Sequence, residues 1–316
     1  MSITNSELVL ANRVTSAITP AARPDWLSPA LFPFRSRFVD AEGTHFHYVD
    51  EGSGPTLLFV HGAPMSSFMW RHPLSVLRAS HRCVAVDLPG LGGSKSLLVR
   101  GKGFARNADA LQAFVRALDL DDFTLIIHST GGPSSLEMAV RERDRLRGLV
   151  ISNTFAWPLA PDPGVGTMVR IVSSRLFRFL VVRLNLLARI AARIGRRHGT
   201  FSAEERAVVL GPFRQVETRA VLANLLYGLR VETPFLTRLE GRLPELADVP
   251  TLLLFSDEDN GYRAGFMDRF ARMLPSHASV VLHAAHFLTE DAPEAYTAAL
   301  EGWLAERPSR TKPENA

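Results

Sequence analysis

The sequence predicts an α/β fold whose mostly parallel sheet is covered by helices on both faces. Two observations predict it. Short apolar, β-branched runs bounded by turn residues recur along the chain, and helix-like stretches separate the later runs. The runs are apolar at nearly every position, which is typical of parallel strands that are buried on both sides.

Eight strands are expected, and the first two, separated by Glu42-Gly43, indicate a hairpin at the sheet edge. In chain order the expected strands are Arg37–Asp40, His45–Asp50, Leu57–His61, Arg82–Asp87, Thr124–His128, Gly148–Ser152, Thr251–Ser256 and Ser279–Leu282. Helices are predicted at Asn107–Leu118, Ser134–Arg143 and Tyr262–Met273.

The strand pattern stops at Pro158 and resumes only after about Glu245. Only helical stretches occur between these residues, and Ser202 and Glu205 have the spacing of a capping box that opens one helix. We therefore predict a helical cap that is inserted after the sixth strand and lies over the end of the sheet.

Four parts of the chain follow from this pattern. Prolines at positions 20, 24 and 29 break any long helix near the N-terminus. The expected parts are an N-terminal lead-in at 1–30, a sheet core at 31–157 and 246–305, a helical cap at 158–245, and a flexible polar tail at 306–316.

Composition limits the class of protein. Of the 316 residues, 46% are hydrophobic and 22% charged, which argues against a disordered, collagenous or coiled-coil chain. A net charge of +4 is too small to indicate a nucleic-acid partner. The single cysteine, Cys83, excludes an internal disulfide and a cysteine-rich zinc site, and its apolar neighbours predict a buried side chain.

Targeting signals are not visible in the sequence. The N-terminus lacks the basic and apolar regions of a signal peptide, and no stretch of about 18 residues is apolar and uncharged. We therefore expect a cytoplasmic protein. The sequence carries no signal for its oligomeric state.

Candidate catalytic residues follow three of the expected strands. Ligands of an open α/β sheet bind beyond the carboxyl ends of its strands, where Ser129, Asp259 and His286 are expected to lie. Because serine is a weak nucleophile at neutral pH, it needs an imidazole base, and a carboxylate must orient that imidazole. We predict Ser129 as nucleophile, His286 as base and Asp259 as acid, with His283 and Asp257 as the alternatives for the last two.

The segment around Ser129 predicts a sharp turn between a strand and a helix. A nucleophile in such a turn needs small neighbours, and Gly131 supplies one of them. Ile127 stands where the usual G-x-S-x-G pattern has its first glycine, so the pattern is half met. The helix that begins near Pro133 directs its N-terminal N–H groups toward the serine.

An oxyanion hole is predicted from two backbone N–H groups. One belongs to Thr130, the residue after the nucleophile, and the other to Ala63 in the loop after the third strand. Pro64 has no N–H and only fixes the turn. Just after the sixth strand, Asn153, Phe155 and Trp157 are the expected lining residues of a substrate pocket, which the apolar cap should cover.

The sequence resembles the α/β-hydrolases, and within them the branch of haloalkane dehalogenases and epoxide hydrolases. The segments that carry the resemblance are His61–Arg71, Asp87–Lys95, Ile127–Pro133, Gly148–Pro158 and His286–Glu294. The resemblance implies an α/β-hydrolase fold with a cap domain in the helical insertion. It also implies an aspartate nucleophile followed by tryptophan, where Ser129 and Thr130 stand, and a halide-binding asparagine, where Ala63 stands. Asn153 matches a residue that helps to bind halide in some members.

These replacements change the expected reaction. Serine attack on an alkyl halide would leave an ether, whereas attack on a carbonyl gives an acyl-enzyme that water can cleave. We therefore predict a serine hydrolase of an ester, lactone or thioester of an apolar small molecule, with no cofactor. Dehalogenase or epoxide hydrolase activity, C–C bond hydrolysis and a non-catalytic binding role remain as alternatives. No metal site is predicted, because no histidine or acidic residues have ligand spacing.

The positive charge belongs to the expected cap. Residues 158–245 hold 14 arginines and no lysine against 7 acidic residues, a net charge of +7, which leaves −3 for the remainder. Arg189, Arg193, Arg196 and Arg197 recur at three- and four-residue steps, which predicts one face of a helix. That face is either solvated or in contact with an acidic substrate or an anionic membrane.

Overall fold

The computed structural model describes residues 22–96 and 103–306. The first 21 residues of the expected lead-in, and the expected tail beyond Glu306, lie outside the described residues. The chain forms one sheet in the order β1-β2-β4-β3-β6-β7-β8-β9, with β5 paired to β2. The strands are β1 Ser36–Ala41, β2 Thr44–Glu51, β3 Thr56–Val60, β4 Arg82–Val86, β5 Lys95–Ser96, β6 Phe123–His128, β7 Leu146–Ser152, β8 Thr251–Ser256 and β9 His277–Leu282.

All eight predicted strands are present, and the sequence missed only the two-residue β5 in the part of the chain that the structure describes. Pairing from β4 through β3, β6, β7 and β8 to β9 is parallel. The pairs that include β2 are antiparallel, and the pair of β1 with β2 at the sheet edge is the predicted hairpin. The sheet is therefore mostly parallel.

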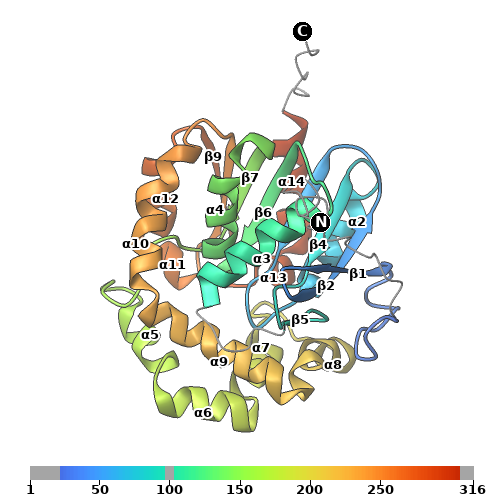
Figure 1. Cartoon of the computed structure of the whole chain (residues 1–316), viewed down its shortest axis with the longest axis vertical. Coiled ribbons are helices and arrows are strands. Elements are labelled where there is room, and N and C mark those ends of the chain that lie inside the picture. The colour runs from blue at the N-terminus through green and yellow to red at the C-terminus, as the bar shows by residue number, and fades with distance from the viewer. Residues whose placement is uncertain (1–21, 97–102, 307–316) are drawn as a thin grey trace, which may run out of the picture.

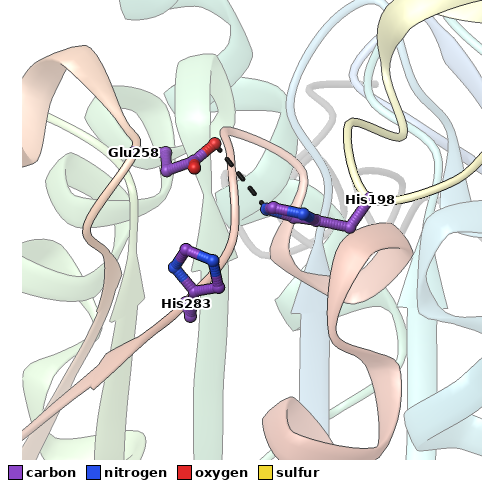
Figure 2. A group of neighbouring side chains, drawn as sticks. All are labelled: His198, Glu258 and His283. Carbon is purple, nitrogen blue, oxygen red and sulfur yellow. Dashed lines mark ion pairs between the residues drawn. The ribbon is translucent and has the colours of Figure 1, made fainter.

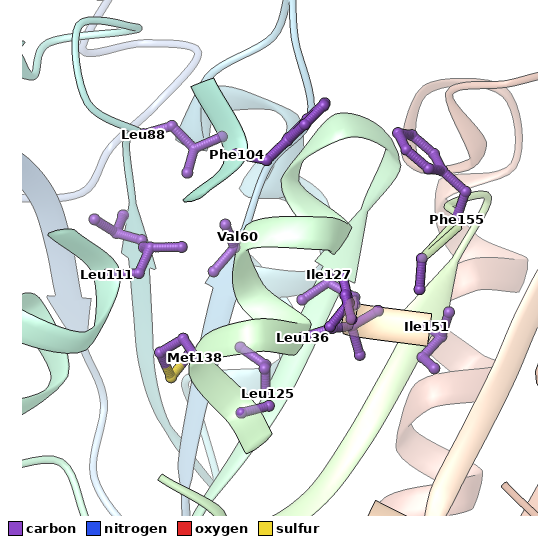
Figure 3. Packing of buried hydrophobic residues seen from close by; sticks show 14 of the residues in the cluster. Val60, Leu88, Phe104, Leu111, Leu125, Ile127, Leu136, Met138, Ile151 and Phe155 are labelled. Atoms are coloured by element: carbon purple, nitrogen blue, oxygen red, sulfur yellow. The ribbon is translucent and has the colours of Figure 1, made fainter. Parts of the chain in front are cut away.

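Helices cover both faces of this sheet. Successive side chains of a strand point to opposite sides, so an apolar strand has apolar side chains to bury on each face. Leu58 and Val60 of β3 pack in the same cluster as the helices in front of the sheet, while Leu57 and Phe59 pack behind it. Figure 3 shows the front cluster, which contains Leu136 of α4 together with Ile127 and Ile151 of the sheet. The helices outside the cap are α2 Arg71–Leu77, α3 Gly103–Ala117, α4 Gly132–Arg141, α11 Asn260–Arg263, α12 Phe266–Met273, α13 Leu288–Asp291 and α14 Pro293–Ala305.

The predicted helix Tyr262–Met273 is interrupted, so its continuity was wrong. Gly265 has a φ of 78° and separates α11 from α12. This left-handed conformation ends an α-helix, and glycine adopts it without steric cost.

Residues 158–245 form only helices, as predicted. The α-helices are α5 Gly166–Val172, α6 Arg175–Leu184, α7 Leu186–Ile194, α8 Ala203–Leu210, α9 Val216–Val231 and α10 Thr233–Arg242. The predicted capping box opens α8: Glu205 N donates to Ser202 Oγ over 3.1 Å, and Ser202 N donates to Glu205 Oε2 over 2.7 Å.

The cap lies over the carboxyl ends of the strands. Val221 of α9 packs against Gly90, in the loop that follows β4. Glu232, buried between α9 and α10, accepts hydrogen bonds from Phe104 N and Ala105 N at the start of α3. In Figure 1 the cap helices α5 to α9 gather along one end of the sheet, away from α2 and α14. The loops expected to carry catalytic residues therefore face the cap.

The prediction that Arg189, Arg193, Arg196 and Arg197 share one face of a helix was wrong. α7 ends at Ile194, so Arg196 and Arg197 lie in the following loop. Arg196 turns toward the sheet core and lies 3.2 Å from Glu290 Oε2, whose other partner is Arg71. Glu290 is buried, and its ion pairs join the cap to α13 and α2. Arg196, which the sequence analysis placed on a helix surface, therefore forms an ion pair with a buried carboxylate.

Candidate active site

Ser129 lies in the sharp turn between β6 and α4. Its φ is 53°, in the left-handed region that a residue other than glycine seldom adopts. A Cβ atom on Gly62 would lie 2.4 Å from Ser129 Cβ, and one on Gly131 would lie 2.3 Å from the His61 carbonyl oxygen. Small residues are therefore required at both positions. Ile127 is tolerated in place of glycine because its side chain points into the front core (Figure 3).

Thr154 stabilises this turn from the neighbouring strand end. Its hydroxyl donates to the Ser129 carbonyl oxygen over 2.5 Å, and a Cβ on Gly132 would lie 1.9 Å from the same hydroxyl. Sequence reasoning missed Thr154. Its position just after β7 could have indicated this role. His128 and Ser152 are paired in parallel strands, so the loop that follows Ser152 lies beside the turn that holds Ser129.

The three residues predicted as nucleophile, base and acid lie in one chain of hydrogen bonds. Ser129 Oγ is 2.8 Å from His286 Nε2, and His286 Nδ1 is 2.7 Å from Asp259 Oδ2. Ser129 is 5% exposed and Asp259 is 6% exposed, whereas the His286 side chain is 42% exposed. His283 and Asp257, the alternatives, bind each other instead over 2.9 Å.

Asp259 is held as a carboxylate. Burial would raise its pKa, but the hydrogen bond and charge of His286 and the N–H groups of Tyr262 and Gly261 outweigh burial, so the pKa lies below its ordinary value. Both N–H groups donate to Oδ1, over 2.7 Å from Gly261 and 3.2 Å from Tyr262. Oδ2 remains for His286, which fixes the proton of that ring on Nδ1.

Two buried side chains position the backbone of His286. His128 Nε2 donates to the His286 carbonyl oxygen over 2.8 Å, and burial lowers the pKa of His128 to about 3, so its ring stays neutral. Asn153 Nδ2 donates to the same oxygen over 3.0 Å and to Ser256 Oγ over 2.7 Å. Its Oδ1 accepts from Ser256 N. The amide of Asn153, which was predicted to line a pocket, therefore binds the backbone of the His286 loop and Ser256.

The predicted oxyanion donors are neighbours, but one of them is already engaged. Ala63 N donates to the Thr130 hydroxyl over 2.8 Å. An oxyanion that accepts from Ala63 must therefore displace this hydroxyl, which rotation about the Thr130 Cα–Cβ bond allows. His61 fixes the same loop: its Nδ1 donates to Gly62 O and its Nε2 accepts from Leu88 N, and burial lowers its pKa.

The aromatic residues expected to line the pocket belong to the core. Trp157 is fully buried and packs against Phe266 and Phe270, so its assignment to the pocket was wrong. Phe155 is 6% exposed and meets Phe104 edge to face, in the front cluster. Both follow β7, and both side chains pack inside the molecule.

This arrangement defines an α/β-hydrolase: a mostly parallel sheet with a strained serine after a central strand, and an acid and a histidine after the last two strands, in the order Ser, Asp, His. The chain belongs to the α/β hydrolase family, whose model matches residues 57–299.

Relatives place the chain in the dehalogenase-like branch of that family. It is 34% identical to haloalkane dehalogenase 2 of Mycobacterium tuberculosis over 279 residues, which cover 86% of this chain and 96% of the relative. It is 27% identical to a cis-3-alkyl-4-alkyloxetan-2-one decarboxylase of Shewanella oneidensis, over 87% of this chain and 90% of the relative. The crystal structure of a haloalkane dehalogenase from Bradyrhizobium elkani superimposes with a TM-score of 0.75 at 25% identity, covering 85% of this chain and 96% of that one.

Proposed function

We propose that this enzyme is a serine hydrolase that cleaves a carboxylic ester-type bond (an ester, lactone or thioester) of an apolar small molecule. The observation that carries the proposal is the hydrogen-bonded chain from Ser129 Oγ through His286 to Asp259. An imidazole within 2.8 Å of a hydroxyl, and itself oriented by a carboxylate, is what a serine nucleophile requires.

The reaction proceeds through an acyl-enzyme. Ser129 Oγ attacks the carbonyl carbon while His286 Nε2 takes the hydroxyl proton, and the Asp259 carboxylate stabilises the imidazolium. The N–H groups of Thr130 and Ala63 donate hydrogen bonds to the oxyanion once the Thr130 hydroxyl has turned aside. His286 then protonates the leaving group and activates a water that cleaves the acyl-enzyme.

The chemistry of Ser129 argues for a carbonyl substrate. A carboxylate nucleophile can displace halide from an sp³ carbon because the alkyl ester that results is opened by water. A serine in its place would form an alkyl ether, which hydrolysis does not reopen under these conditions. Attack on a carbonyl has no such dead end, because the acyl-enzyme is itself an ester.

The Shewanella relative adds support for a cyclic ester. Its name states that it is a decarboxylase of an alkyl-substituted oxetan-2-one, which is a four-membered lactone, so it supports the substrate class rather than the hydrolytic step. A lactone carbonyl is open to attack by Ser129 in the same way as that of a linear ester. Alkyl-substituted lactones are therefore included in the test.

The test is a substrate panel combined with covalent labelling. Esters, lactones and thioesters of graded chain length are offered together with bromoalkanes, and a fluorophosphonate probe is mapped by mass spectrometry. We expect turnover of at least one acyl substrate, no halide release, and one labelled peptide that contains Ser129. Absence of both acyl turnover and labelling would overturn the proposal.

Haloalkane dehalogenase activity is the second candidate, because the Mycobacterium relative carries that name at 34% identity. Halide release from a bromoalkane without acyl turnover would favour it. An epoxide hydrolase would turn over only epoxides, and a C–C bond hydrolase would turn over only ketones with a cleavable neighbouring bond. A non-catalytic binding protein would turn over none of the substrates.

A further inference from the structure

Three potential metal ligands meet where the cap joins the loops of the active site. His198 follows α7, Glu258 follows β8 and His283 follows β9, and one ligand atom from each lies within 4.8 Å of the others. His198 Nε2 is 3.7 Å from Glu258 Oε2, and the two imidazole rings have centroids 4.9 Å apart (Figure 2). The sequence predicted no metal site, because these residues come from distant segments and have no local spacing.

The backbone of each ligand is fixed by hydrogen bonds. The Asp291 carboxylate accepts from His198 N over 3.1 Å and from Arg197 N over 2.6 Å, and its other oxygen accepts from Ala285 N over 2.9 Å. Glu258 N donates to Ala284 O over 3.2 Å. Asp291 thus connects the loop of His198 to the loop of His283, and Glu258 is hydrogen-bonded to that same loop. The backbone of the three residues is therefore already ordered before a ligand binds.

The side chains are also arranged as metal ligands. His283 Nδ1 bonds Asp257 Oδ2 over 2.9 Å, which orients the ring and leaves Nε2 for a metal, the usual carboxylate–histidine–metal arrangement. Glu258 Oε2 is shielded from solvent and accepts no hydrogen bond from the part of the chain that the structure describes. The Arg197 guanidinium lies 2.8 Å from it as an ion pair, but that side chain is 66% exposed and can turn into solvent.

We propose that His198, Glu258 and His283 bind a divalent transition metal ion of the Zn²⁺ type. Two imidazoles and one carboxylate suit zinc, with bonds of about 2.0–2.2 Å that the exposed histidines can reach by rotation. Glu258 precedes Asp259, and His283 lies three residues before His286. The bound ion therefore joins the cap to the two loops that carry the acid and the base.

Titration with Zn²⁺ alone tests this site in the full chain. Isothermal calorimetry is expected to give one bound ion, and His198→Ala and His283→Ala should each weaken binding about tenfold or more. Bound Zn²⁺ should also raise the Tm of the wild-type protein. Mg²⁺ should not compete, because it prefers an all-oxygen octahedral site.

His45→Ala is the matched control, because His45 forms a similar exposed pair with Asp40, over 2.7 Å, without belonging to the cluster. It should bind Zn²⁺ as the wild type does. The proposal is overturned if no ion binds, or if both cluster variants bind Zn²⁺ as tightly as the His45→Ala protein.

A different observation concerns the outer surface of the cap. Helices α5, α6 and α7, which contact one another in sequence, expose large apolar side chains, up to 69% for Leu176 and 68% for Ile194. The set, here called the apolar cap surface, is Met168, Ile171, Leu176, Phe179, Leu184, Ile190 and Ile194. In Figure 1, α5 and α6 form the outer edge of the cap.

The helices of the apolar cap surface also carry positive charge. No acidic residue occurs between Met168 and Arg197. Five exposed arginines lie on the same helices, and among the described residues none of them forms an ion pair: Arg170, Arg175, Arg183, Arg189 and Arg193. Exposed apolar side chains beside unpaired arginines are typical of helices that lie in a membrane interface.

We propose that the apolar cap surface binds an anionic lipid bilayer peripherally. A second copy of the chain fits less well, because a two-fold contact would bring two acid-free, arginine-bearing surfaces together. Anionic headgroups complement that charge, and the apolar side chains enter the acyl boundary. Among the described residues, no helix has both the length and the apolar character needed to span a bilayer.

Co-sedimentation with vesicles tests the lipid surface. Binding to phosphatidylcholine vesicles should rise steeply when phosphatidylglycerol is added and fall with salt. The double variant Arg189→Gln/Arg193→Gln and the double variant Leu176→Ser/Phe179→Ser should each bind about tenfold less. Val281→Ser, which changes an exposed apolar residue of β9, should bind as the wild type does.

Equal binding to neutral and anionic vesicles, or no binding, would overturn the proposal. So would a dimer in sedimentation equilibrium that Leu176→Ser/Phe179→Ser dissociates, because the surface would then be covered by a second copy.

Discussion

A Ser129→Ala protein is expected to lose nearly all acyl hydrolysis, with kcat falling by about 10⁶-fold. The hydroxyl that His286 Nε2 faces at 2.8 Å is removed, and alanine offers no atom that can form an acyl-enzyme. The residual rate should come only from the oxyanion donors and substrate binding. Steady-state kinetics on the best acyl substrate measures the fall, and labelling by the fluorophosphonate should disappear with it.

Ser135→Ala is the matched control for this change. Ser135 is a buried serine of α4 whose hydroxyl has no hydrogen-bond partner among the described residues, so alanine removes the same atom without breaking a described hydrogen bond. Its kcat should stay within a few-fold of the wild type. If Ser129→Ala and Ser135→Ala hydrolysed the substrate equally well, Ser129 could not be the nucleophile.

An Asp259→Asn protein is expected to keep its fold and lose about 10⁴-fold in kcat. The asparagine amide can donate to His286 Nδ1, which favours the tautomer with its proton on Nε2. That nitrogen then cannot accept the proton of Ser129. The same substitution also removes the charge that stabilises the imidazolium, and the side-chain oxygen still accepts from Gly261 N and Tyr262 N, so stability should change little.

Asp40→Asn provides the comparison for Asp259. Asp40 bonds the Nδ1 of His45 over 2.7 Å, the same geometry as the Asp259 pair, but on an exposed strand outside the active site. Its kcat should be unchanged. A large loss in an Asp257→Asn protein combined with little loss in Asp259→Asn would instead assign the acid to Asp257.

Local patterns were sufficient for most of the fold. Apolar, β-branched runs such as Leu57–His61 and Thr124–His128 correspond to β3 and β6, because a strand buried on both faces is apolar at nearly every position. The capping box at Ser202 was likewise readable, since both partners lie within one turn of helix. The two-residue β5 was not, because two residues have no period.

Errors arose where a contact depended on distant segments. Trp157 was assigned to a pocket because it follows a strand end, but its ring is buried against Phe266 and Phe270 of α12. Arg196 and Arg197 continued a helical spacing, but α7 had already ended and Glu290 and Glu258 bound them. The hydrogen bonds of Asn153 to Ser256 and His286 likewise join distant segments and were not predicted.

The sequence by itself determined that Ser129, Asp259 and His286 stand at strand ends, because the carboxyl ends of parallel strands meet at one edge of a sheet. Only the tertiary structure decided which groups bind each other there. In the tertiary structure, His286 bonds Asp259 and His283 bonds Asp257. Ala63 N donates to the Thr130 hydroxyl. His198, Glu258 and His283 come together as potential metal ligands. Such pairings depend on distances of a few ångströms between loops that are far apart in the chain, and no local periodicity encodes them.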